Sequence, residues 1–133
     1  MQSWIFITSP KSYQMDKCLL EYDFVDFRQR NKLSVNDIVY IYVSSPVQSI
    51  KYKMIVERIN IPYNETFDDS SFDVPTKPLL TLRYYSRLRL LDKTDTPKLH
   101  LSHLREHGLI SSLQTNVKVS GELLEYIDSS FNK

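Results

Sequence analysis

The sequence predicts an α+β fold: a small, curved β-barrel of five to six mainly antiparallel strands flanked by short helices, in a single domain spanning residues 1–133. Two observations favour this class. Strand-like segments, with apolar residues that alternate or run continuously, make up most of the chain, and the helix-like segments are short. The order of the segments also lacks the regular strand–helix–strand alternation that accompanies a parallel α/β sheet.

Five segments, four strands and the short extended piece Phe24–Phe27, are predicted because each is rich in β-branched and aromatic residues. They are Ser3–Thr8, Phe24–Phe27, Ile38–Ser44, Ser49–Ile61 and Thr81–Leu91. The third is apolar at successive positions, which is typical of a strand covered on both faces. We expect it to form an antiparallel hairpin with the fourth, in which Ile50, Tyr52, Met54 and Val56 share one face.

The remaining segments are predicted as short helices and loops. Tyr13–Tyr22 has apolar residues three and four apart, and Ser102–His107 is followed by Gly108, a residue that commonly ends helices. A final helix is expected from the N-cap Ser120 through Ile127. Leu109–Val119 is predicted as an irregular strand, and the proline-containing residues 62–78 as a long loop.

Composition excludes several classes of protein. The net charge is only +1, so the chain is not a globally basic nucleic-acid binder, although a basic patch is still compatible with it. A single cysteine, Cys18, excludes an intramolecular disulfide and a cysteine-based zinc site. Only two glycines are present, which argues against a glycine-rich phosphate loop. Without a long apolar run or a signal peptide, we expect no membrane association and a cytoplasmic setting.

Two patterns suggest metal chemistry. His103-Leu104-Arg105-Glu106-His107 matches H-x-x-E-H, in which two histidines on one helix face bind zinc and the glutamate acts as general base. A third ligand is missing from this pattern, so the favoured interpretation is a solvated helix with surface histidines. Asp68 and Asp69 could hold a divalent ion, but the pair is better explained as part of an acidic loop.

A cluster of arginines suggests phosphate binding. Arg83, Arg87 and Arg89 lie on one side of a predicted strand with Tyr85 among them. Residues 77–118 contain eight lysines and arginines against three acids, a local charge of +5. Clustered arginines and aromatic rings suit phosphate contact and base stacking. The alternative is a solvated face of the sheet.

A second group of residues suggests a pocket for a planar base. Trp4, Tyr40 and Tyr42 supply aromatic rings, and nearby serines supply hydrogen-bonding groups. Tyr42 and Ser44 are two positions apart on a strand and therefore share a face. We expect Trp4 to converge with them on one cavity, with Gln114 and Asn116 across it. The alternative is that these aromatic residues form the core.

These pieces together resemble the EVE domain of the PUA-like superfamily, in particular the EVE-like domains that precede HNH-type endonucleases in bacteria. The similarity is carried by residues 4–10 (WIFITSP), residues 36–44 (NDIVYIYVS), the following strand, and the late segments around Leu104–Leu109 and Leu113–Val119. Two departures stand out. Asn36-Asp37 replaces the usual Gly-Asp, which asparagine tolerates because it adopts left-handed backbone geometry. Thr115-Asn116 replaces the usual Gly-Pro.

The resemblance implies a PUA-like pseudobarrel and a non-enzymatic module that binds DNA or RNA and captures a flipped base, typically a modified cytosine. No cofactor or metal is expected, and a nuclease is an expected partner. The residues assigned to the base pocket are Trp4, Ser9, Pro10, Tyr42, Ser44, Ser45, Gln114 and Asn116. Those assigned to phosphate binding are Lys11, Arg83, Arg87, Arg89 and Lys118. The alternatives are a small-molecule or nucleotide-binding domain that uses the same pocket, and a zinc hydrolase that uses His103 and His107.

Overall fold

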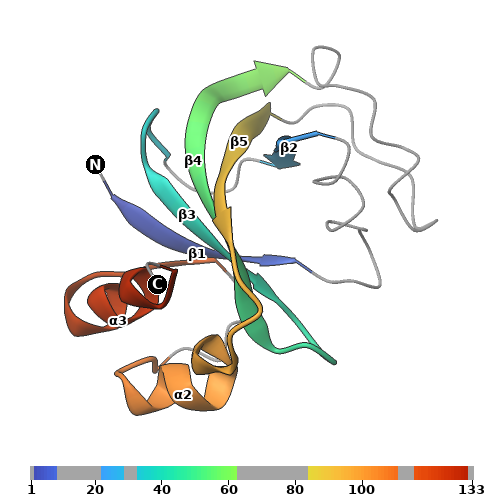
Figure 1. The fold of residues 1–133 in the computed structure, drawn as a ribbon. Helices are drawn as coiled ribbons and strands as arrows, with labels where there is room; N and C mark the ends of the chain where they lie inside the picture. The colour runs from blue at the N-terminus through green and yellow to red at the C-terminus, as the bar shows by residue number, and fades with distance from the viewer. Residues whose placement is uncertain (1, 9–21, 29–32, 63–83, 111–115, 132–133) are drawn as a thin grey trace.

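One curved sheet and a group of short helices make up the computed structural model, which describes residues 2–8, 22–28, 33–62, 84–110 and 116–131 (Figure 1). The strands are β1 (Ser3–Thr8), β2 (Phe24–Arg28), β3 (Ile38–Val43), β4 (Ser49–Pro62), β5 (Tyr84–Lys93) and β6 (Val117–Lys118). The helices are the 3-10 turn η3 (Pro97–Leu99), α2 (Leu101–Glu106) and α3 (Gly121–Phe131).

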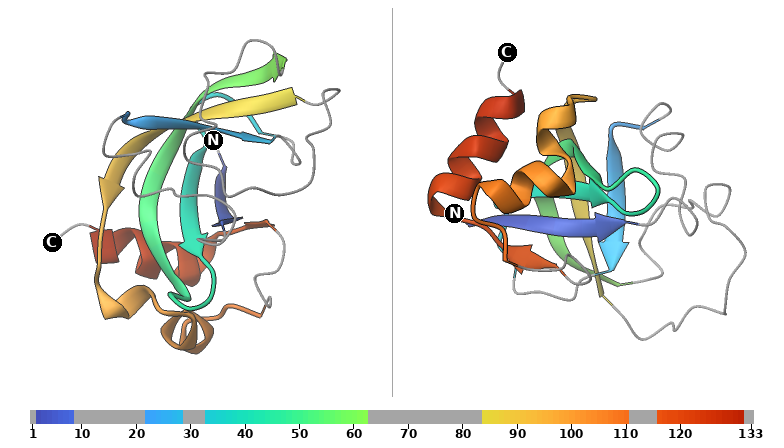
Figure 2. Two further views of the ribbon diagram at one scale, coloured as in Figure 1. Left: turned by 90° about the vertical axis from the view of Figure 1, so that its right-hand side faces the viewer. Right: turned by 90° about the horizontal axis from the view of Figure 1, so that it is seen from below.

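The strands form one sheet in the order β2-β5-β4-β3-β1-β6. β1 and β3 are parallel, with Ser3 opposite Ile38 and Thr8 opposite Val43, and the other neighbouring strands are antiparallel. The sheet curls strongly, and α2 and α3 lie together on one side of it (Figure 2). The predicted α+β class and the predicted hairpin of the third and fourth strands are therefore confirmed.

Apolar side chains pack on both faces of this sheet. The inner face, turned away from α2 and α3, carries one cluster that draws on β1 to β5: Trp4, Phe6, Val25, Val39, Ile41, Tyr52, Met54, Val56 and Leu88. The outer face carries a second cluster, in which the helices cover β1, β3 and β4: Ile5, Tyr40, Tyr42, Ile50, Leu99, Leu104, Ile127 and Phe131. The two clusters explain why β3 is apolar at every position.

A bulge in β4 makes one prediction wrong, namely that Ile50 shares a face with Tyr52, Met54 and Val56. Tyr52 lies opposite Ile41, but Ile50 lies opposite Tyr42, so Lys51 is an extra residue in the ladder. An extra residue reverses the alternation of side chains beyond it. Ile50 therefore packs on the outer face, not with Tyr52, Met54 and Val56 on the inner face.

A polar contact fixes α3 to the outer face. Tyr40 Oη donates to Asp128 Oδ1 at 2.9 Å, and Lys53 Nζ donates to the same oxygen at 2.6 Å. The bond from Lys53 holds the pKa of Asp128 below its ordinary value. Burial raises the pKa of Tyr40, so the phenol remains a donor at neutral pH.

The boundaries of several elements differ from the predictions. α3 extends through Phe131, four residues beyond Ile127, because Phe131 packs on Tyr40 with ring centres 5.8 Å apart. In the described part of the predicted irregular strand, Val117 and Lys118 form β6, which pairs with Trp4 and Ile5. The predicted helix at 13–22 lies outside the described residues except for Tyr22. Among the described residues, no helix is long and apolar enough to cross a membrane.

Candidate functional site

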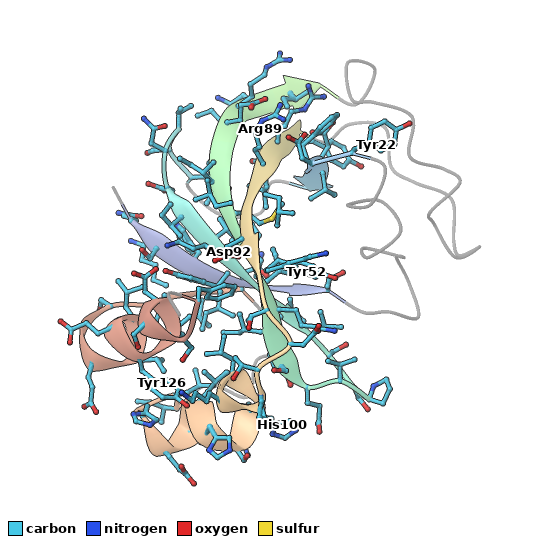
Figure 3. All side chains as sticks on the ribbon, in the orientation of Figure 1. Tyr22, Tyr52, Arg89, Asp92, His100 and Tyr126 are labelled. Carbon is cyan, nitrogen blue, oxygen red and sulfur yellow. The ribbon has the colours of Figure 1, made fainter. Side chains whose placement is uncertain are left out.

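A cleft of about 350 Å³ opens between the start of β4 and the segment that connects β5 to α2. Val47 and Pro97 provide its apolar surface. Its polar lining combines hydroxyl groups, two imidazoles, an ammonium group and a carboxylate, contributed by Ser49, Lys51, Asp95, Thr96, His100, Ser102 and His103. Figure 3 shows His100 at this end of the molecule, beside α2.

Backbone hydrogen bonds hold the two walls of the cleft together. The Leu101 amide donates to the Gln48 carbonyl at 2.9 Å, and the Thr94 amide donates to the Lys51 carbonyl at 2.8 Å. Ser49 and His100 also form an isolated antiparallel bridge. Leu99 and Leu104 are fully buried on the outer face, so their packing holds η3 and α2 against the sheet. The two walls of the cleft are therefore fixed to each other through the main chain.

The charged groups of the cleft are only partly neutralised. Lys51 Nζ lies 3.1 Å from Asp95 Oδ1, and the Asp95 side chain is 91% exposed. Lys98 and Arg105 are exposed on η3 and α2, and no ion pair among the described residues includes either of them. Lys98 and Arg105 therefore keep exposed positive charge on the two helical segments that also supply lining residues of the cleft.

Trp4 and Tyr42, predicted to share one cavity, lie on opposite faces of the sheet, so that expectation is wrong. Trp4 pairs with Val39, and Tyr42 is three positions further along β3, so alternation turns it to the other face. Trp4 is 5% exposed and Tyr42 is 4% exposed, each within its own core cluster. Neither residue lines the cleft beside α2.

Asp37 satisfies the indole N–H of the buried Trp4. Its carboxylate accepts hydrogen bonds from the amides of Gln2 at 2.9 Å and Ser34 at 3.0 Å, and from Trp4 Nε1 at 3.3 Å. Burial raises the pKa of Asp37, but these bonds outweigh it, and the pKa lies below its ordinary value of 3.8. The preceding Asn36 has a φ of 77°, so the predicted left-handed turn is confirmed. Asn36-Asp37 thus links the beginning of β1 to the beginning of β3.

The other residues assigned to the base pocket are dispersed. The Ser44 amide donates to the Thr8 carbonyl at 2.9 Å, and Ser45 is exposed in the turn after β3. Asn116 Oδ1 accepts from the Ile7 amide at 3.2 Å and so ties the approach to β6 to β1. Ser9, Pro10 and Gln114 lie outside the described residues. Base binding by any of these residues remains a prediction.

Arg87 and Arg89, two of the three residues of the predicted arginine face, are neutralised by acids on or next to neighbouring strands. Arg87 Nε lies 2.8 Å from Asp26 Oδ1, and Arg89 bonds both Glu57 and Asp23. Both guanidinium groups lie over the ring of Phe24, at 4.6 Å and 5.5 Å. The bond from Arg89 holds the pKa of Glu57 below its ordinary value. We call the set Arg87, Arg89, Asp23, Asp26 and Glu57 the arginine cluster.

The remaining phosphate-binding assignments are separated from the arginine cluster. Lys118 Nζ lies 5.4 Å from the centre of the Trp4 ring, on β6 at the other edge of the sheet. Lys11 and Arg83 lie outside the described residues. Phosphate binding remains a prediction for all five assigned residues: Lys11, Arg83, Arg87, Arg89 and Lys118.

The two histidines of the H-x-x-E-H pattern have different surroundings. His103 lines the cleft, whereas the His107 ring stacks on Tyr126 at 3.6 Å, with His107 Nδ1 3.8 Å from Glu122 Oε1. α2 ends at Glu106, so His107 is its C-cap and no longer follows the helical face. No three potential metal ligands come together in the described part of the chain.

Sequence reasoning missed most of the cleft. Ser49, Lys51, Asp95 and Ser102 lie in segments far apart in the chain, and no short motif connects them. A signal was available for His100, which occupies the N-cap position before the predicted helix at Ser102–His107. The residues that face this cleft could be found only after the turn of β3–β4 was placed against α2.

Comparisons with known proteins show the fold. No family profile and no curated protein matches the sequence. Among solved structures, an ASCH protein from Zymomonas mobilis is 12% identical with a TM-score of 0.63, covering 96% of this chain and 94% of that one. A protein from Rhodopseudomonas palustris is 10% identical with a TM-score of 0.68 (99% and 94% covered). One from Leishmania major is 15% identical with a TM-score of 0.67 (99% and 95% covered).

These similarities extend over nearly the whole chain. The fold is therefore a PUA-like pseudobarrel of the kind found in ASCH proteins, and the predicted fold class is confirmed. The six strands form one curled sheet with β2 and β6 at its two edges, which fits a pseudobarrel.

Proposed function

We propose that this PUA-like domain binds nucleic acid and holds one nucleotide of a single-stranded or opened segment in the cleft beside α2. The main support for this proposal is the size of the cleft, whose volume of about 350 Å³ is large enough for a nucleotide. Small-molecule sites commonly measure roughly 300–1,000 Å³. Imidazole rings can stack on bases, and hydroxyl and ammonium groups can bond base edges and phosphates.

The charges around the cleft support contact with the phosphate backbone. Lys98 and Arg105 flank the lining residues, and Lys51 contributes a third positive charge from β4. Phosphate contacts by lysine and arginine supply most of the sequence-independent affinity for nucleic acid. The arginine cluster is a weaker candidate for this role because its acids already occupy Arg87 and Arg89.

The proposal includes the capture of a flipped base. The resemblance to EVE domains supports a modified cytosine as that base, DNA or RNA as the strand, and a fused or separate nuclease as the partner. It also supports a domain without catalytic activity of its own, and the low cysteine content supports a cytoplasmic setting. The cleft's size supports a second candidate, a free nucleotide or similar small molecule bound at the same place.

The proposal is tested by fluorescence anisotropy with labelled oligonucleotides. Single-stranded and duplex DNA and RNA, with cytosine or 5-methylcytosine, are titrated between low and physiological salt. We expect affinity to fall as salt rises, and Lys98→Ala with Arg105→Ala to reduce the slope of log K against log salt by about two. Cytidine monophosphate competition separates the second candidate from strand binding.

A matched control is Arg58→Ala, which removes an exposed arginine of β4. We expect this variant to bind like the unmodified protein. The proposal fails if no oligonucleotide binds at low salt, or if Arg58→Ala weakens binding as much as the two substitutions beside the cleft.

A further inference from the structure

The hydrogen bonds of His100 determine which of its ring nitrogens carries the proton. Its Nδ1 lies 3.2 Å from the backbone nitrogen of Ser102, which can only donate, so Nδ1 must accept. A neutral imidazole has one donor and one acceptor nitrogen. The proton is therefore on Nε2, and His100 offers the cleft an N–H donor while Nδ1 caps α2.

His103 has the opposite arrangement. Its Nδ1 faces Glu106 Oε2 at 3.4 Å, and a carboxylate oxygen can only accept. The proton of a neutral His103 is thus on Nδ1, which leaves Nε2 as an acceptor. Both histidines line the same cleft, so with each Nε2 turned toward the cavity it contains one histidine donor and one histidine acceptor.

We infer that the cleft recognises the hydrogen-bonding edge of a nucleobase, with His100 as the donor and His103 as the acceptor. This inference rests on the proposed function and names the part of the nucleotide that the site reads. The Watson–Crick edge of a base presents an acceptor next to a donor, such as N3 and the amino group of cytosine. A phosphodiester presents acceptors only, which would match His100 and Lys51 but leave His103 without a partner.

The neighbouring groups fit this assignment. Thr96 Oγ1 accepts from the Lys98 amide at 3.3 Å, so its hydroxyl proton remains available to a ligand. Ser49 adds a hydroxyl that can rotate to donate or accept. Lys51, held at 3.1 Å by Asp95, places a positive charge on the same lining for the phosphate that accompanies the base.

The first test uses isolated nucleosides, which carry a base edge and no phosphate. Binding of cytidine and uridine is measured by calorimetry and by amide shifts in NMR spectra. We expect N4,N4-dimethylcytidine and 3-methyluridine, which lack the edge donor, to bind about tenfold more weakly than their parents. Inorganic phosphate is expected not to displace cytidine. Displacement by phosphate, or equal binding of the methylated nucleosides, overturns the inference.

The second test uses variants of the two histidines. His100→Ser retains an N-cap for α2 but removes the Nε2 donor, and His103→Phe retains an aromatic ring without an acceptor. We expect each to weaken cytidine binding about tenfold and to leave the salt dependence of oligonucleotide binding unchanged. Glu106→Gln, which no longer fixes the His103 proton, should weaken cytidine binding without altering any lining residue.

His107→Phe is the matched control, because His107 belongs to the same segment but stacks on Tyr126 outside the cleft. Cytidine binding should be unchanged in this variant. Melting temperatures establish that each variant is folded. One outcome is that oligonucleotides bind with the expected salt dependence while methylation of the base edge leaves nucleoside binding unchanged. In that case only the inference about the base edge is wrong. If no oligonucleotide binds, the proposed function is wrong, and nucleoside binding then decides the inference separately.

Discussion

The arginine cluster and the cleft beside α2 lie at opposite ends of the molecule, where Figure 3 labels Arg89 and His100, and their charged side chains are paired differently. In the arginine cluster, Arg87 and Asp26 are 17% and 1% exposed and bond through two parallel contacts of 2.8 Å and 3.0 Å. In the cleft beside α2, Asp95 is 91% exposed, and the only ion pair of Lys51 among the described residues is with it. The Arg87–Asp26 pair is thus largely closed to solvent, whereas the cleft has an exposed carboxylate partner for Lys51.

The difference separates charges that serve the fold from charges that can serve a ligand. A buried or bidentate ion pair has already exchanged its hydration for protein partners, so a ligand gains little by competing for it. A solvated lysine or an imidazole nitrogen without a protein partner retains its bonding capacity. Net charge along the sequence does not distinguish these cases, since the partners of Arg87 and Arg89 come from other strands.

The largest effect is expected from Asp26→Ala, which leaves Arg87 without its carboxylate. Breaking a largely buried pair by removing one partner costs about 3–5 kcal/mol. Urea unfolding should therefore show a much lower free energy of unfolding. The matched substitution at the other end, Asp95→Ala, removes an exposed partner and should cost less than about 1 kcal/mol. Equal losses in the two variants would remove the distinction between the two ends.

A smaller effect is expected from Asp37→Asn, at a buried carboxylate satisfied entirely by N–H groups. The NH₂ group of asparagine would face N–H groups that also donate, so at least one hydrogen bond would be lost. The free energy of unfolding should fall by about 1–3 kcal/mol. Because the pKa of Asp37 is lowered in the folded state, its contribution is complete above the unfolded value of 3.8 and is lost as pH falls through the folded pKa.

Urea midpoints measured between acidic and neutral pH check this linkage. The stability of the unmodified protein should fall more steeply in acid than that of Asp37→Asn. Asp128 and Glu57 also have lowered pKa values and titrate in both proteins, so the difference between the two curves isolates Asp37. Parallel curves would contradict the assignment of Asp37 as a stabilising carboxylate.

The strands were predictable because their signals are local. β1 matches the predicted Ser3–Thr8, and β3 and β4 differ from their predictions by a single residue at one end, since β-branched and aromatic residues recur there. The left-handed turn at Asn36 was also predictable, because few residue types adopt that geometry. The bulge at Lys51 was not, because nothing in an alternating pattern marks where one residue leaves the ladder.

The candidate site was harder to predict because it depends on packing between distant segments. The expectation that Trp4 and Tyr42 meet assumed that neighbouring strands present their aromatic residues to one side. The parallel register of β1 and β3 instead places them on opposite faces. The same holds for ion pairs. Only the tertiary structure shows which acids bond Arg87 and Arg89, and that Lys51 pairs with Asp95.

The smallest stability effects distinguish the inner face from the cleft as the place where a base binds. Trp4→Phe retains an aromatic ring in the core but removes the bond to Asp37, and should cost about 1–2 kcal/mol. Since Trp4 is buried among Phe6, Val39 and their neighbours, oligonucleotide affinity should not change. Lys51→Ala should cost less than about 1 kcal/mol in stability but weaken oligonucleotide binding. Anisotropy and urea unfolding on the same samples measure both quantities. Loss of base-dependent binding in Trp4→Phe, with Lys51→Ala unaffected, would move the site from the cleft to the inner face.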